Sequence, residues 1–138
     1  MKNDRDFLII TNNPLAAKCM AGRFEMRLYE ELSYREILVV VRDLIYAGHK
    51  LYTHPLAGSV KPNETPYRSV VVSRDPGKLD FDDVQIISNA IERFDIFTPR
   101  HIVMTEKLHN DFQLIDYTLL AGAVDFDAVA GLSRIKDK

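Results

Sequence analysis

The chain has 138 residues, which predicts one domain spanning 1–138, with 1–6 and 125–138 peripheral or frayed. Its 18 basic and 20 acidic side chains give a net charge of −2 and form no basic run, so a nucleic-acid partner and a membrane-surface partner are not expected. Cys19 is the only cysteine, which excludes an intrachain disulfide and a cysteine-based metal cluster.

The first third of the chain predicts two strands around a short helix. Phe7–Thr11 is a continuous apolar run, typical of a strand buried on both faces. The polar residues before it form no signal peptide, so a cytoplasmic location is expected. Residues 15–21 predict a short helix that ends at Gly22, and 24–29 alternate like a half-exposed strand.

The clearest predicted helix begins after Ser33. Ser33 and Glu36 have the spacing of a capping box, in which each side chain satisfies a backbone N–H of the first turn. Gly48 supplies the left-handed residue that ends the helix. The buried stripe consists of Ile37, Leu38, Val41, Leu44 and Ile45.

The remaining elements are two strands and two helices. Residues 50–53 predict a third strand and Ser69–Ser73 a fourth. A helix capped by Asp80 or Asp82 is expected to run to about residue 97, and a last helix to span 107–124. Residues 101–104 fit either a fifth strand or the first turns of a helix.

This order predicts an α/β fold, a small three-layer sandwich with a mainly parallel sheet of four or five strands and helices on both faces. In such sheets ligands bind beyond the carboxyl ends of the strands. Two loops leave predicted strands at that edge, residues 11–14 and the segment that begins at Thr53. The short amides of Asn12 and Asn13 are expected either to cap the following helix or to bind a ligand.

The segment 53–68 is the most unusual part of the sequence, because it holds three of the six prolines and predicts no regular structure. Its prolines stiffen the backbone, and Lys61 and Arg68 offer a point charge and a planar fork for an anion. A small anionic or zwitterionic metabolite is therefore the expected ligand. A loop that only connects two elements across the sheet edge can have the same composition. The candidate ligand-binding residues are Asn12, Asn13, Thr53, His54, Gly58, Ser59, Lys61, Asn63, Glu64, Thr65 and Arg68.

Several stretches resemble the GrdX family. They read DLI at 43–45, GHKL at 48–51, THPLAGSVKPNETPY at 53–67 and FQLID at 112–116. That family takes its name from an open reading frame lying among the genes for glycine, sarcosine and betaine reductase in amino-acid-fermenting anaerobes. The resemblance implies a cytoplasmic accessory role near a selenoprotein reductase, with a reductase component as a partner. It implies no catalytic residues and no reductase chemistry, since Cys19 stands alone.

Other chemistry has little support in the sequence. Neither a P-loop nor a Gly-x-Gly-x-x-Gly occurs, and no cofactor is expected. The four histidines show no ligand spacing, so no metal site is expected either. Asp116, within an apolar helix, is expected either to pair with a cation of the loop or to face solvent.

Three functions fit these observations. The first is an accessory protein that binds a small ligand or a reductase component through 53–68. The second is an enzyme acting on a small anionic metabolite, with His54 or Glu64 as acid or base and Lys61 and Arg68 holding the anion. The third is a structural interaction module, with a homo-oligomer formed through apolar helix faces.

Overall fold

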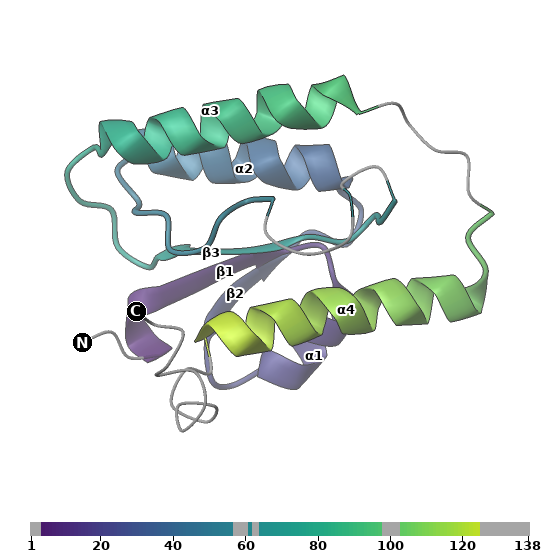
Figure 1. Ribbon diagram of the computed structural model, residues 1–138. Helices are drawn as coiled ribbons and strands as arrows, with labels where there is room; N and C mark the ends of the chain where they lie inside the picture. Colours follow the sequence, from purple (N-terminus) through teal and green to yellow (C-terminus); the bar gives the residue numbers. More distant parts are fainter. Residues whose placement is uncertain (1–3, 57–60, 62–63, 98–102, 125–138) are drawn as a thin grey trace.

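The computed structural model describes residues 4–56, 61, 64–97 and 103–124 (Figure 1). Within these residues a three-stranded sheet lies between two helical layers, with α2 and α3 on one face and α1 and α4 on the other. The elements in chain order are a 3₁₀ turn at Asp4–Asp6, β1 (Phe7–Thr11), α1 (Pro14–Met20), β2 (Glu25–Leu28), α2 (Tyr34–Tyr46), β3 (Ser69–Ser73), α3 (Phe81–Ile96) and α4 (Glu106–Val124).

The sheet has the order β2-β1-β3 and is mixed. β1 runs parallel to β2, with Leu8 opposite Glu25, and antiparallel to β3, with Thr11 opposite Ser69. The helices cover both faces as expected. The prediction of a mainly parallel sheet of four or five strands is wrong.

The direction of β3 follows from the connection before it. Residues 50–53 and β3 are joined by a segment in which the described residues form no helix, and a parallel pair would need a long crossover, usually helical. The chain instead reverses, and Leu51 forms an antiparallel bridge with Val72. Because 50–53 runs in the same direction as β1, β3 is antiparallel to both.

Residues 50–53 do not form the predicted third strand, because side-chain oxygens take the places of backbone acceptors. The backbone N–H of Val71 donates to Thr53 Oγ1 at 3.0 Å, and that of Lys50 donates to Ser73 Oγ at 2.7 Å. The N–H of Leu51 donates to Asp83 Oδ2 at 2.9 Å. Side chains that compete in this way interrupt a ladder. Only the isolated bridge at Leu51 remains.

Neither alternative for 101–104, a fifth strand or the first turns of a helix, is formed by the part of this range that the structure describes. Residues 103 and 104 belong to no helix or strand, and α4 begins at Glu106. Residues 101 and 102 lie outside the described residues.

The core is divided by the alternation of side chains along β1 and β3. Leu8 and Ile10 pack with Val70 and Val72 against α2 and α3. Ile9 and Val71 face the other way, toward Ala16, Met20, Leu120 and Val124 of α1 and α4. Successive side chains of a strand point to opposite faces, so a sheet covered on both sides needs the continuous apolar runs seen in the sequence.

The four helices confirm the helix predictions. Ser33 and Glu36 form the capping box of α2, and Asp80 caps α3 by accepting from the N–H groups of Asp82 and Asp83. Gly48 lies just beyond the end of α2 and has a φ of +106°. Its carbonyl accepts from the backbone N–H of Gly77. Among the described residues, no helix is both long and apolar enough to cross a membrane.

Candidate functional site

A buried polar network lies where the carboxyl end of β1 meets the start of β3. Thr11 Oγ1 and Ser69 Oγ are 2.7 Å apart. Asp116 of α4 accepts from Ser69 twice, at 2.6 Å from Oγ and at 3.0 Å from the backbone N–H. Asn13 Nδ2 donates to the same carboxylate at 3.0 Å. All four side chains are buried, so α4 is fixed to the edge of the sheet by hydrogen bonds that water does not reach.

Arg68 joins this network to the segment 53–68. Its Nη2 lies 3.5 Å from Asp116 Oδ1, while Nη1 donates to the carbonyl of Pro55 at 3.2 Å and to the hydroxyl of Tyr34 at 3.3 Å. Burial raises the pKa of the Tyr34 phenol, and Arg68 partly offsets this rise. Of the two roles that the sequence left open for Asp116, the structure shows pairing with a cation of the loop. Arg68 is therefore buried and binds groups of the protein itself.

The two asparagines that follow β1 are also engaged by the protein. Asn12 Nδ2 donates to the carbonyls of Leu32 and Pro66, and Asn12 Oδ1 accepts from the N–H of Arg68. Asn13 Oδ1 accepts from the N–H of Leu15 and so caps α1. The segment 53–68 therefore ends beside Asn12, at the edge of the sheet where β1 ends.

A second group of polar side chains extends the network along α4. Tyr67 OH lies 2.7 Å from His109 Nδ1 and accepts from Gln113 Nε2 at 3.0 Å. Sequence reasoning did not assign a site role to these residues. The signal in the sequence was the spacing of His109, Gln113 and Asp116, which puts three polar groups on one face of the helix.

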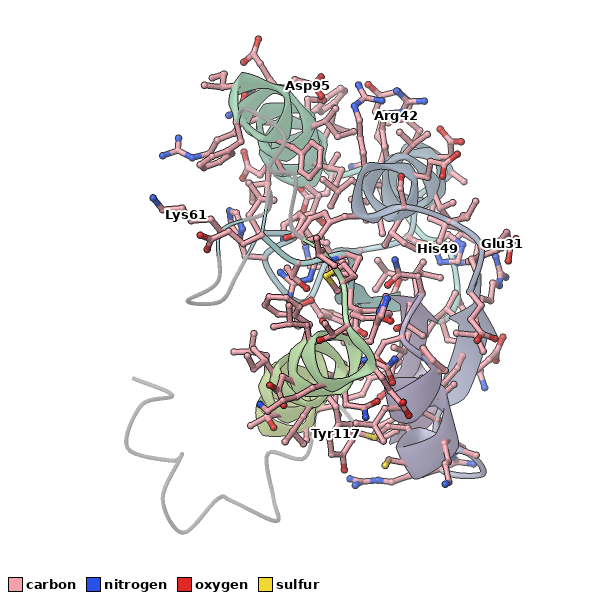
Figure 2. The ribbon with its side chains drawn as sticks, turned by 90° about the vertical axis from the view of Figure 1, so that its right-hand side faces the viewer. Glu31, Arg42, His49, Lys61, Asp95 and Tyr117 are labelled. Carbon is pink, nitrogen blue, oxygen red and sulfur yellow. The ribbon has the colours of Figure 1, made fainter. Side chains whose placement is uncertain are left out.

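Other predicted site residues serve the backbone or face solvent. Thr53 Oγ1 accepts from the N–H of Val71, and Thr65 Oγ1 from the N–H of Tyr67. Lys61 is exposed, and its side chain projects outward (Figure 2), while its carbonyl accepts from the N–H of Glu64. Gly58, Ser59 and Asn63 lie outside the described residues.

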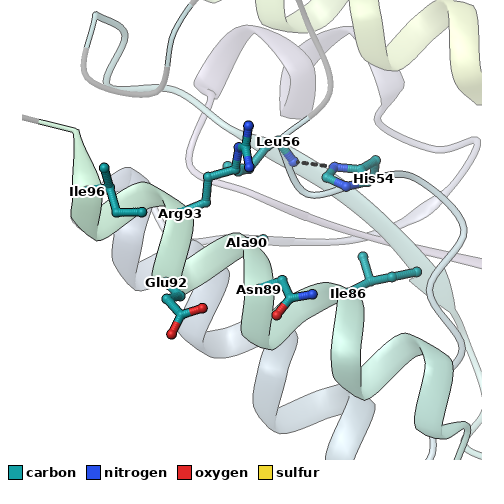
Figure 3. Close-up of a pocket in the computed structure, with 8 residues that line it drawn as sticks. All are labelled: His54, Leu56, Ile86, Asn89, Ala90, Glu92, Arg93 and Ile96. Carbon is teal, nitrogen blue, oxygen red and sulfur yellow. Dashed lines mark hydrogen bonds between the residues drawn. The ribbon is translucent and has the colours of Figure 1, made fainter.

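His54 is the predicted site residue that borders a hollow, of about 500 Å³, between the loop and α3 (Figure 3). The lining residues are His54, Leu56, Ile86, Asn89, Ala90, Glu92, Arg93 and Ile96. His54 Nδ1 accepts from the N–H of Leu56 at 3.1 Å. A ring nitrogen that accepts carries no proton, so the proton of neutral His54 is on Nε2.

The polar part of this lining comes mainly from α3. Arg93 extends from the last turns of the helix toward Leu56 (Figure 3) and makes no hydrogen bond or ion pair with any described residue. Asn89 Oδ1 accepts from Gln85 Nε2 at 3.1 Å, so its acceptor is engaged. Glu92 adds one carboxylate to the lining. The hollow thus offers a guanidinium, an imidazole N–H and an amide beside four aliphatic side chains.

Within the described ranges, no three His, Cys, Asp or Glu side chains are grouped in a way that could hold a metal ion.

Both the buried network and the hollow lie in a part of the chain that matches a known protein family. A family model described as "GrdX-like protein" matches residues 8–125. The chain belongs to the GrdX-like protein family. This confirms the resemblance seen in the sequence, and the matched range contains both the buried network and the described lining of the hollow. Searches of curated proteins and of solved structures gave no match.

Proposed function

We propose that this GrdX-like protein is a non-catalytic accessory protein of a glycine, sarcosine or betaine reductase system, and that it binds a small anionic or zwitterionic ligand in the hollow beside His54. The hollow carries this proposal. Its volume of about 500 Å³ falls within the range of roughly 300–1,000 Å³ typical of metabolite sites. The guanidinium of Arg93 supplies a charge for a carboxylate, and Glu92 a charge for an amine.

Both walls of the hollow are held in place without a ligand. On the loop side Pro55 is buried, and its carbonyl accepts from Arg68, which is itself held by Asp116. On the helix side α3 packs against α2, and its Asp95 forms a bidentate ion pair with Arg35. Walls that are already ordered reduce the entropic cost of binding a ligand, which supports a binding role.

The surroundings of His54 support binding over acid–base catalysis. A catalytic histidine is usually oriented by a carboxylate or another side chain that stabilises its charged form. In the described structure His54 Nδ1 instead accepts from a backbone N–H. In the described structure His54 is therefore oriented by the loop backbone, without the side-chain partner that a catalytic histidine usually has.

A thermal-shift screen tests the proposed ligand site. The panel contains glycine, sarcosine, betaine, acetyl phosphate, nucleotides and hexanoate, each measured with the wild type and with Arg93→Ala. A ligand at 100 times its dissociation constant stabilises the fold by about 2.7 kcal/mol, a rise in Tm of roughly 10 °C for a chain of this size. Arg27→Ala is the control, because Arg27 is an exposed arginine on β2 at the far edge of the sheet.

We expect one member of the panel to raise the Tm of the wild type and of Arg27→Ala, and to raise that of Arg93→Ala much less. A panel without effect, or an equal rise in all three proteins, contradicts a ligand site in the hollow.

The proposed reductase partner needs a separate test, because membership of the GrdX-like family is the only observation that supports it. Tagged protein is purified from an anaerobe that expresses the reductase genes, and the bound proteins are identified by mass spectrometry. The proposal expects a reductase component in amounts comparable to the tagged chain. Recovery of the tagged chain without any such component contradicts the accessory role.

A further inference from the structure

We infer that the ligand of the hollow is a monocarboxylate with an aliphatic body, larger than glycine, sarcosine or betaine. This inference rests on the proposed function, because it concerns the same site. It is carried by three features of the lining: its length along α3, the share of aliphatic side chains in it, and the balance of charge around Arg93.

The first feature is the length of the hollow. Its helical wall runs from Ile86 to Ile96, ten steps along the helix that rise about 15 Å at 1.5 Å per step. The lining positions recur every three or four residues, so they lie along one side of the helix. A ligand with two or three heavy atoms beyond its carboxylate contacts only a small part of such a wall. The shape therefore fits an elongated molecule.

The second feature is the chemistry of the wall. Leu56, Ile86, Ala90 and Ile96 are aliphatic, and Ile96 is 76% exposed. Covering this surface removes apolar area from water, which favours a ligand with methylene groups. The described lining contains no Phe, Tyr or Trp, so it lacks the aromatic cage with which proteins often hold a quaternary ammonium such as that of betaine.

The third feature is charge. Arg93 offers one full positive charge, and His54 offers Nε2–H as a donor while its Nδ1 accepts from the N–H of Leu56. Glu92 lies next to Arg93 in the chain and lines the same hollow. A second negative charge on the ligand would lie close to Glu92, so this pair disfavours a phosphate or a dicarboxylate relative to a monocarboxylate.

Isothermal titration calorimetry on the full chain tests the ligand class. The probes are hexanoate, hexanol, hexylamine and acetate, together with glycine, sarcosine and betaine. Each buried methylene strengthens binding about fourfold, so hexanoate, with four more methylenes, should bind roughly 250-fold tighter than acetate. Loss of the charge-assisted hydrogen bond should make hexanol at least tenfold weaker than hexanoate. Hexylamine should also bind more weakly than hexanoate, because it lacks the carboxylate that the guanidinium of Arg93 binds.

Two variants and a control locate the binding. Arg93→Gln should weaken hexanoate about tenfold or more and leave hexanol unchanged, since only the carboxylate uses the guanidinium. His54→Asn should weaken hexanoate by a smaller factor, because an asparagine can still accept from the N–H of residue 56 but lacks the Nε2–H donor. Arg27→Gln, at the far edge of the sheet, should behave as the wild type. Far-UV circular dichroism confirms that each variant is folded.

The outcomes separate the inference from the proposed function. Binding of glycine, sarcosine or betaine in an Arg93-dependent manner, with no binding of hexanoate, overturns the inference and leaves the proposed site standing. Hexanoate binding that is unchanged in Arg93→Gln places the ligand elsewhere and overturns both. Absence of binding by every probe also overturns the inference.

Discussion

The guanidinium of Arg68 lies 3.5 Å from the carboxylate of Asp116, and the two residues are 6% and 3% exposed. Arg68 comes from the end of the segment 53–68, and Asp116 from the middle of α4. The same carboxylate accepts from Ser69 and Asn13. One buried anion therefore fixes the loop, the sheet edge and α4 relative to one another, and the loop wall of the hollow depends on it.

Removal of Asp116 should be strongly destabilising. Asp116→Ala leaves Arg68 as a buried charge without its carboxylate, which typically costs about 3–5 kcal/mol. Urea denaturation followed by circular dichroism measures the change. Asp111→Ala is the matched control on the same helix, because Asp111 pairs with Lys107 in solvent and such pairs contribute about 1 kcal/mol or less. Equal losses in both variants would contradict a central role for Asp116.

The stability should fall at alkaline pH in a way that depends on Tyr34. Burial raises the pKa of this phenol above its ordinary value, with Arg68 opposing part of the rise. The folded state then holds the proton more tightly than the unfolded state. The resulting stabilisation is complete below the unfolded pKa, near 10, and is lost as the pH rises through the folded pKa.

Urea midpoints measured from pH 8 to pH 11 test this dependence. Tyr34→Phe should be less stable at neutral pH, by about 1 kcal/mol for the lost hydrogen bond to Arg68, and should show a shallower decline above pH 10. Tyr46→Phe, at an exposed tyrosine on the same helix, should follow the wild type. Parallel curves for Tyr34→Phe and the wild type would show that Tyr34 is not responsible.

A methyl group at Gly48 should cost more than one at Gly22. Both glycines have positive φ, +106° and +82°, where a Cβ costs about 1–2 kcal/mol. At Gly48 the added Cβ would also overlap the carbonyl of Gly77, whereas at Gly22 it meets nothing within 4 Å. We expect Gly48→Ala to lose about 2–5 kcal/mol in the free energy of unfolding, and Gly22→Ala about 1–2 kcal/mol. A smaller loss at Gly48 than at Gly22 would be inconsistent with this contact.

The sequence predicted the helices well because their ends carry local signals. Asn13, Ser33 and Asp80 cap α1, α2 and α3 through bonds to residues two or three positions ahead. The apolar periodicity of the sequence identified the buried face of α4 less well. Ile115 and Leu119 are 38% exposed, while the polar Asp116 is buried, because its partners come from distant parts of the chain.

The sheet and the site could not be predicted from local patterns. The alternation of strands and helices favoured parallel pairing, but the direction of β3 was set by a connection whose described part contains no helix. Likewise, Arg68 was expected to face a ligand, and it faces Asp116, 48 positions away in the chain. Arg93 and Asn89 were not among the candidates, since an exposed helix face gives no sign that a loop will lie beside it.

The most direct test of the hollow as a ligand site is an NMR titration of ¹⁵N-labelled full-length protein with hexanoate and with glycine, sarcosine and betaine. We predict saturable shifts of the backbone amides of His54, Leu56 and residues 86–96 for one of these ligands, and their loss in Arg93→Gln. Saturable shifts confined to other parts of the chain, or no shifts with any ligand, would contradict it.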